Sequence, residues 1–122
     1  MKPTFIALLA LCLCLPLAGA DKKKPLPKDL KSLEALAEKG DADAQNQLGY
    51  LYDRAAILAT TEEVKKKLWT EAVKWFRKSA EQGDVKSQYE LGRVYEYGLG
   101  VEKDPKEAVK WYRKAAEQQI KI

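Results

Sequence analysis

Apolar side chains recur along this chain at spacings of three and four residues, which is the period of amphipathic α-helices. The recurrence predicts five helices, over residues 28–39, 42–58, 61–82, 85–97 and 105–119. Two of the apolar faces have the same form: Ala44, Leu48, Leu51 and Tyr52 on one helix, and Ser87, Leu91, Val94 and Tyr95 on another. We expect both faces to be buried.

Glycine and aspartate separate the predicted helices. Gly40 and Gly83 each stand directly after a helix, a position that favours glycine because the backbone there is left-handed. Asp41 and Asp84 follow them and are expected to cap the next helices, and Asp104 is expected to cap the last one. The boundaries between helices are therefore predicted from both apolar periodicity and turn residues.

The chain contains an internal repeat. Residues 37–52 align with residues 80–95, and eight of the sixteen positions are identical. Residues 71–82 align with residues 107–118, and ten of the twelve positions are identical. These alignments predict one domain over residues 28–122, divided into a half repeat (28–40), a full repeat (41–83) and a truncated repeat (84–119).

Gly92 interrupts a helical pattern, where glycine costs roughly 1 kcal/mol relative to alanine. Gly49 is its counterpart 43 residues earlier. Both glycines lie beside a core leucine of the predicted helix pairs. We therefore expect the paired helices to cross closely at these two positions, with no room for a side chain.

The second repeat carries a set of residues at fixed spacings: Ser87, Leu91, Gly92, Tyr95, Gly98, Gly100, Val101, Asp104, Ala108, Trp111, Tyr112, Lys114, Ala115 and Ala116. This set closely resembles the Sel-1-like repeat, a member of the tetratricopeptide-like α-solenoids, and the resemblance covers about residues 30–119. It implies an all-α fold, a short α-solenoid of about five antiparallel helices, with Trp75 and Trp111 in the core. Members of this family usually act as scaffolds and adaptors.

The first repeat departs from the family pattern between Tyr52 and Ala72. These residues are 20 positions apart, whereas their counterparts in the second repeat are 13 apart, so seven residues are inserted. The inserted segment has helical character, and Thr60 with Glu63 predicts a capping box at the start of the second helix. We expect a longer helical hairpin that projects beyond its neighbour.

The first twenty residues have the features of a signal peptide. Phe5–Leu15 is an unbroken apolar run, and Ala18-Gly19-Ala20 has the small residues found at a cleavage site. We expect cleavage near Ala20, a linker over residues 21–27, and a periplasmic or secreted protein. An uncleaved N-terminal anchor is the alternative, although the run is shorter than the roughly 20 apolar residues of a membrane span.

The formal net charge is +4, and lysines alternate with glutamates along the chain. This pattern is typical of solvated helix faces, whereas a nucleic-acid footprint needs a basic stripe on one side. No nucleic-acid partner is therefore expected. The Lys22-Lys23-Lys24 run is interpreted as a solvated tail, with contact to an anionic membrane surface as the alternative.

Catalytic chemistry is not indicated by the sequence. The chain has no histidine, and both cysteines belong to the predicted signal peptide. No catalytic residue, metal ligand or cofactor-binding residue is therefore predicted, and no cofactor is expected. The Gly98–Gly100 turn lacks the lysine and hydroxyl residue of a phosphate-binding loop.

The resemblance implies that the first helix of each pair lines a concave groove. The stripes beside their core faces are therefore the candidate partner-binding residues: Asp43, Asn46, Tyr50 and Asp53, and then Lys86, Tyr89, Arg93, Glu96 and Tyr97. Alternatively, the tyrosines at positions 50 and 89 only cover neighbouring helices. Trp69, in the insertion, either seals the long hairpin or is an exposed anchor.

These observations favour an exported, non-enzymatic module that grips a partner polypeptide in its groove. Some small exported Sel-1-like proteins are immunity proteins that neutralise a periplasmic toxic effector, which is one specific expectation. An enzyme of envelope remodelling or a β-lactam-related enzyme is the alternative, weakened because the latter relatives carry a cysteine pair in each repeat. A third possibility is a structural scaffold that self-associates through Ile120 and Ile122.

Overall fold

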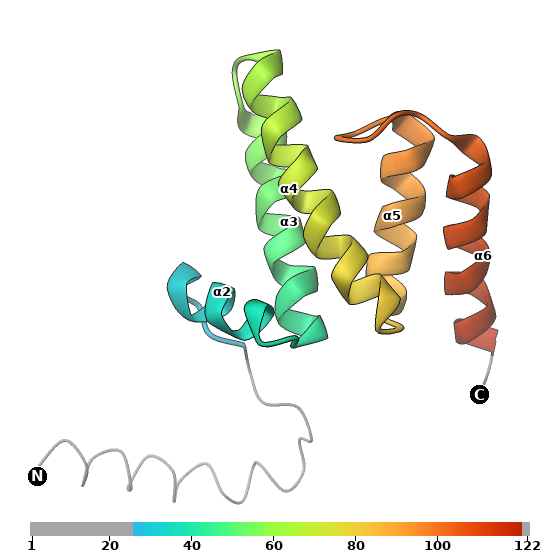
Figure 1. Ribbon diagram of the computed structural model, residues 1–122, viewed down its shortest axis with the longest axis horizontal. Helices are drawn as coiled ribbons and strands as arrows, with labels where there is room; N and C mark the ends of the chain where they lie inside the picture. The colour runs from blue at the N-terminus through green and yellow to red at the C-terminus, as the bar shows by residue number, and fades with distance from the viewer. Residues whose placement is uncertain (1–25, 121–122) are drawn as a thin grey trace, which may run out of the picture.

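The computed structural model describes residues 26–120, so the predicted signal peptide and residues 21–25 of the predicted linker lie outside the described part. Over this range the chain forms no strand, which confirms the all-α prediction. The helices, labelled as in Figure 1, are α2 (Leu30–Glu38), α3 (Ala42–Leu58), α4 (Glu62–Glu81), α5 (Val85–Tyr97) and α6 (Pro105–Ile120).

The helices form a row in which each one packs against the next in sequence (Figure 1). α3 and α4 make one antiparallel pair, α5 and α6 make a second, and α4 also packs against α5. This is the short α-solenoid expected from the repeats. Between residues 26 and 120, no helix is both long and apolar enough to span a bilayer.

Aspartate side chains cap four of the described helices, which confirms the sequence prediction for Asp41, Asp84 and Asp104. At the start of α6, the Asp104 carboxylate accepts from the Glu107 N–H at 3.2 Å. The other three contacts are shorter. In each of these, the carboxylate accepts a hydrogen bond from a backbone N–H at 2.9 Å: Asp29 from Ser32, Asp41 from Ala44, and Asp84 from Ser87.

The predicted capping box of Thr60 with Glu63 is wrong. Thr61 caps α4 instead, because its side chain accepts from the Val64 N–H at 3.3 Å. With the cap one residue later, valine occupies the third helical position. Valine has no side-chain oxygen that could accept a hydrogen bond from the backbone N–H of the cap residue, so no capping box forms.

Two apolar clusters hold the row together. Leu48 and Trp75 belong to the cluster that joins α2, α3 and α4. Phe76, Leu91 and Trp111 belong to the cluster that joins α4, α5 and α6. Trp75 and Trp111 are both buried, which confirms that they are core residues.

Leu51 is an exception to the predicted core face. Its counterpart Val94 is fully buried, whereas Leu51 keeps 43% of its surface exposed. α4 has 20 residues and covers most of the length of α5, but α2 has only 9 residues and lies against one end of α3 (Figure 1). The expected burial of Leu51 is therefore wrong, because the helix that would cover it is too short.

Gly49 and Gly92 lie where the paired helices approach closely, as the sequence predicts. A β-carbon on Gly49 would lie 2.6 Å from the ring of Phe76, and one on Gly92 would lie 2.6 Å from the ring of Tyr112. An aromatic ring of the second helix thus occupies the space where the first helix has no side chain. This contact explains why both repeats carry glycine in mid-helix.

The α3–α4 hairpin extends past the end of α5, which agrees with the expected projection of the inserted residues (Figure 1). The loop after α5 approaches this hairpin with its backbone. Gly100 has a φ of 74°, and a β-carbon there would lie 2.5 Å from the carbonyl carbon of Trp69 and 2.7 Å from the Thr70 nitrogen. Gly100 is therefore required both by its positive φ and by the close approach.

Replacing Gly100 with alanine is expected to lower the free energy of unfolding by about 2 kcal/mol, because backbone strain adds to the contact with α4. Gly40→Ala is the matched control. Gly40 also has a positive φ, of 105°, but nothing lies within 4 Å of the position of its β-carbon. Gly40→Ala should therefore lower the free energy of unfolding only by the backbone strain, about 1 kcal/mol. Equal losses in urea denaturation of the two variants would contradict the close approach.

Candidate functional site

The stripe predicted to line a groove divides into a buried part and an exposed part. Asn46 and Asp53 are buried, which corrects their expected position on an open surface. The Asn46 amide donates a hydrogen bond to the Ser87 hydroxyl at 2.8 Å, so this flank of α3 is covered by α5. The exposed part consists of Lys86, Tyr89, Glu96 and Tyr97, with Tyr50 and Arg93 partly buried between the two parts.

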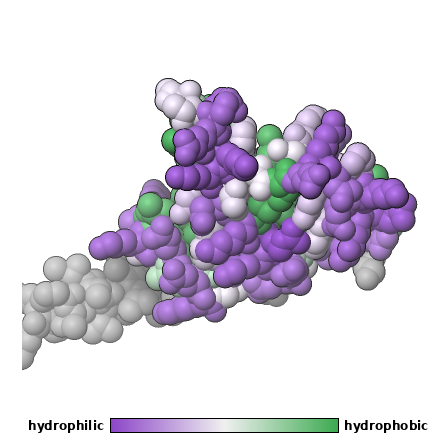
Figure 2. Space-filling view, turned by 45° about the horizontal axis from the view of Figure 1, so that its top comes forward, coloured by the Kyte–Doolittle hydropathy of each residue, from purple (hydrophilic) through white to green (hydrophobic). Residues whose placement is uncertain are grey.

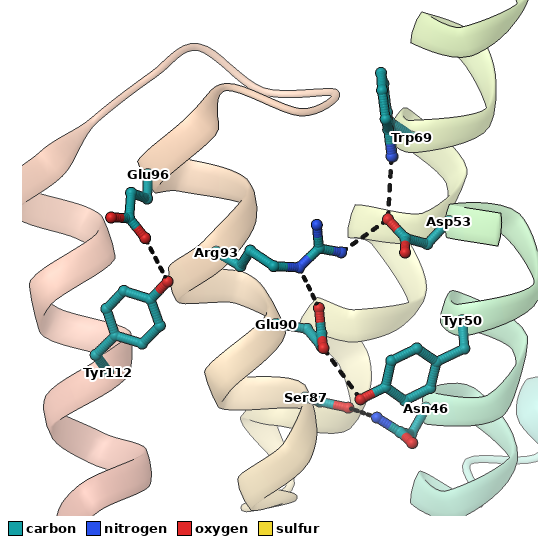
Figure 3. A network of polar contacts seen from close by, with 9 residues as sticks. All are labelled: Asn46, Tyr50, Asp53, Trp69, Ser87, Glu90, Arg93, Glu96 and Tyr112. Carbon is teal, nitrogen blue, oxygen red and sulfur yellow. Dashed lines mark hydrogen bonds and ion pairs between the residues drawn. The ribbon is translucent and has the colours of Figure 1, made fainter. Parts of the chain in front are cut away.

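Asp53 lies at the centre of a polar network that joins α3, α4 and α5 (Figure 3). Its Oδ1 atom accepts hydrogen bonds from Trp69 Nε1 at 3.0 Å and from Arg93 Nη2 at 2.8 Å. Arg93 Nε donates to Glu90 at 2.6 Å, and the Tyr50 hydroxyl donates to the other Glu90 oxygen at 3.1 Å. Of the two roles expected for Trp69, the structure therefore supports the seal of the long hairpin.

Two hydrogen-bond donors of the network, Arg93 and Tyr50, have raised pKa values. Burial opposes the charge of Arg93, but the hydrogen bonds to Asp53 and Glu90 outweigh it and raise the pKa of Arg93 above its usual value. Burial, and then the Glu90 carboxylate, raise the pKa of Tyr50 to about 12. Both side chains therefore remain hydrogen-bond donors at neutral pH.

A hollow lies on the exposed side of this network, between α3, α5 and α6. Its volume is about 500 Å³, and it is lined by Tyr50, Val85, Lys86, Tyr89, Glu90, Tyr112, Ala115, Ala116 and Gln119. The ring centroids of Tyr89 and Tyr112 are 5.3 Å apart. Three of the predicted residues, at positions 50, 86 and 89, are thus brought together at one place.

The other six lining residues are absent from the predicted stripe, and for two of them, Glu90 and Tyr112, the sequence contains a signal. Glu90 is three positions before Arg93, and the spacing of an acid and a base on one helix face is a signal that points to their pairing. Tyr112 replaces the Phe76 of the first repeat, and its additional hydroxyl donates to Glu96 at 2.7 Å. The change from phenylalanine to tyrosine between the two repeats is the sequence signal that could have identified Tyr112.

The remaining predicted contacts lie outside the hollow. Tyr97 is exposed at the end of α5, and Glu96 is exposed and bonded to Tyr112. Ile120 is exposed at the end of α6, and Ile122 lies outside the described residues. The roles of Glu96 and Tyr97 in binding, and of Ile120 and Ile122 in self-association, therefore stay predictions.

The chemistry that the hollow offers is recognition by stacking, apolar contact and hydrogen bonding. Tyrosine rings and alanine methyl groups supply apolar surface, while Lys86 and Gln119 supply polar groups at its wall. Across residues 26–120, no three His, Cys, Asp or Glu side chains are arranged to hold a metal ion.

Comparison with protein families matches the chain to a model described as Sel1 repeat. The matched segments are residues 42–58, 70–84 and 85–119. The first two segments lie on either side of the tip of the long hairpin, so residues 59–69 are left unmatched. No curated protein matches the chain.

Solved structures also resemble this chain. The crystal structure of a Sel1 repeat protein from Oxalobacter formigenes is 42% identical, with a TM-score of 0.56, and the match covers 72% of this chain. The structure of c5321, a protective antigen of uropathogenic Escherichia coli with an SLR fold, is 32% identical, with a TM-score of 0.44, over 94% of this chain. The matches span only 35% and 31% of those two proteins.

Proposed function

Since the chain belongs to the Sel1 repeat family, whose proteins are generally protein-interaction modules, we propose that it binds a segment of a partner protein in the hollow between α3, α5 and α6. The observation that carries this proposal is the set of tyrosines at that hollow. Tyrosine is enriched at the energetically important positions of protein interfaces. Tyr89 keeps 54% of its surface exposed, although an aromatic ring of this size is more stable when buried.

The walls of the hollow are held in place before a partner arrives. Tyr50 is bonded to Glu90 and packs edge-on against the buried ring of Phe76, with centroids 5.3 Å apart. Tyr112 is bonded to Glu96. Because these side chains are already fixed, a partner would lose little of its binding free energy to ordering them.

We further propose that the protein acts outside the cytoplasm after cleavage near Ala20, without catalysing a reaction. Neutralisation of a toxic effector is one specific form of this proposal. On this proposal, the product of a neighbouring gene is the first partner to test. The hollow would then hold a segment of that effector.

Tyr89→Ala is expected to raise the dissociation constant for such a partner at least tenfold, which corresponds to roughly 1.4 kcal/mol. Isothermal titration calorimetry with the purified partner measures this change. Tyr97→Ala is the matched control, because Tyr97 is on the same helix and is 64% exposed but does not line the hollow.

Residues of the polar network are unsuitable for this test, since their replacement would also disturb the packing of α3 against α5. If Tyr89→Ala binds as tightly as the unchanged protein, or if Tyr97→Ala weakens binding equally, the hollow is not the site. Sedimentation at several concentrations, with and without Ile120→Ser, tests the separate prediction of self-association.

A further inference from the structure

Resting on the proposed function, we infer that the partner segment held at the hollow is an amphipathic α-helix, which packs along α6 as α5 packs along α4. The second helices of the two pairs carry nearly the same segment, since residues 71–82 and 107–118 are identical at ten of twelve positions. α5 covers one face of α4, whereas α6 is the last helix of the row and no described helix lies on its far side (Figure 1). The structure therefore contains the same helix face twice, once covered and once open.

The open face of α6 keeps the apolar residues that are buried on α4. Val73 is 5% exposed and Ala80 is 2% exposed, and both belong to the cluster that α4 shares with α5. Their counterparts on α6 are Val109, which is 52% exposed, and Ala116, which is also exposed. In the view of Figure 2 most of the surface is hydrophilic. Because an uncovered end of a repeat array needs a polar outer face, the valine kept on α6 favours a face that a partner covers.

The hollow is the counterpart of a place that α5 fills in the first repeat. On the first helices of the two pairs, Tyr89 corresponds to Asn46. Asn46 is buried, and its amide donates to the Ser87 hydroxyl of α5 at 2.8 Å. Tyr89 has no such cover, and it lines the hollow together with Ala116 of α6. The equivalent place in the first repeat thus holds an α-helix, which identifies the kind of segment that fits the hollow.

A glutamine contact recurs where a first helix packs against the helix before it. Gln45 Nε2 of α3 donates to the Ala37 carbonyl of α2 at 3.0 Å. Gln88 Nε2 of α5 donates to the Ala80 carbonyl of α4 at 3.2 Å. The corresponding carbonyl on α6 is that of Ala116, so we expect the partner helix to carry a side-chain amide near its start.

An arginine extends the correspondence toward the other end of the helix. Arg77 of α4 donates to the Tyr95 hydroxyl, with the guanidinium 5.8 Å from the centroid of that ring. Arg113 is its counterpart on α6, and it is exposed. By analogy with α5, the expected partner helix has a glutamine, aliphatic residues three and six positions later, and a tyrosine seven positions later.

Another protein suits this face better than a second copy of the chain. The helices of the required kind in this chain are α3 and α5, and each already has the relevant face covered, α3 by α2 and α5 by α4. A second copy could offer either helix only after it lost a packed neighbour. The loss of that packing would oppose the association.

A titration followed by NMR tests this inference. The protein is ¹⁵N-labelled residues 21–122, which contains every described element, and the peptide has the sequence of residues 84–98, which is α5 with its two cap residues. We expect saturable shifts of the backbone amides of α6, with a dissociation constant below about 1 mM, because a short isolated helix must also fold when it binds. A peptide with Leu91→Ser/Val94→Ser should bind at least tenfold more weakly, since it lacks the aliphatic contacts.

Val109→Ser in the protein is expected to weaken binding of the unchanged peptide about tenfold, because the valine loses its apolar contact with the helix. Val109 is half exposed, so this variant should keep the urea midpoint of the unchanged protein. Lys110→Ser is the matched control. Its counterpart Lys74 stays exposed although α5 packs on α4, so position 110 should lie outside the contact.

The inference is overturned if the peptide gives no saturable shift, if both peptides bind equally, or if the shifts avoid α6. With the purified partner, its failure differs from failure of the proposed function. If Tyr89→Ala weakens binding and Val109→Ser does not, the partner fills the hollow without packing as a helix along α6. If neither change weakens binding, the hollow is not the site. A dimer in sedimentation that Val109→Ser dissociates would instead assign this face to a second copy.

Discussion

Gly49→Leu is expected to lower the free energy of unfolding by about 3 kcal/mol or more, although leucine is a better helix former than glycine. Even the first carbon of a side chain at this position would lie 2.6 Å from the Phe76 ring. Phe76 is fully buried in the cluster that joins α4, α5 and α6, so it has no free space into which it can move. Urea denaturation followed by circular dichroism measures the loss.

Two controls separate this contact from the effect of leucine itself. Gln47→Leu introduces the same residue into the same helix at an exposed position, and it should leave stability within about 0.5 kcal/mol. Gly92→Leu should also destabilise the protein and release the second pair, but less than Gly49→Leu. The ring that it meets, Tyr112, is only partly buried and belongs to the last described helix.

A double variant completes the test. If the Phe76 ring is the obstacle, Gly49→Leu/Phe76→Ala should lose less stability than the sum of the two single changes. If the double variant loses the full sum of the two single losses in the free energy of unfolding, the helix crossing lies elsewhere. The same conclusion holds if Gly49→Leu is as stable as the unchanged protein. The comparison therefore tests the position of the crossing as well as its tightness.

Asp53→Ala is expected to lower the free energy of unfolding by about 2–3 kcal/mol. The change removes one of the two carboxylates that Arg93 contacts and leaves Trp69 Nε1 without its acceptor. Removal of one member of a fully buried ion pair costs about 3–5 kcal/mol, and the smaller value is expected because the Arg93 side chain keeps 26% of its surface exposed. Urea denaturation again gives the measurement.

The matched control is an ion pair on the protein surface. Lys110 and Glu107 are 3.7 Å apart with both side chains substantially exposed, so Lys110→Ala should cost less than about 0.5 kcal/mol. The double variant Asp53→Ala/Arg93→Ala should lose less free energy of unfolding than the sum of the losses of its two single variants. If Asp53→Ala destabilises the protein no more than Lys110→Ala does, the polar network does not contribute to the stability of the packing between the two repeats.

The difference between predicted and observed site residues follows from what a helical pattern contains. Periodicity predicts which side chains share a face of one helix, and the family resemblance implies that the first helices of both pairs line one groove. Tyr50, Lys86 and Tyr89 do line one hollow. It does not specify how far a neighbouring helix extends over that face. Asn46 and Asp53 share the stripe of Tyr50, but α5 covers them, and this depends on how α5 crosses α3.

The sequence by itself determined the all-α repeat, the order and approximate ends of the helices, and the glycines at the two crossings. These features depend on local periodicity, on capping residues and on similarity between the two repeats, all of which are present in the order of residues. Only the tertiary structure decided that Leu51 is exposed, that Asp53 joins α3 to α4 and α5, and which tyrosines meet at the hollow. Those outcomes depend on the lengths and crossings of neighbouring helices, because a side chain is buried by what packs against it.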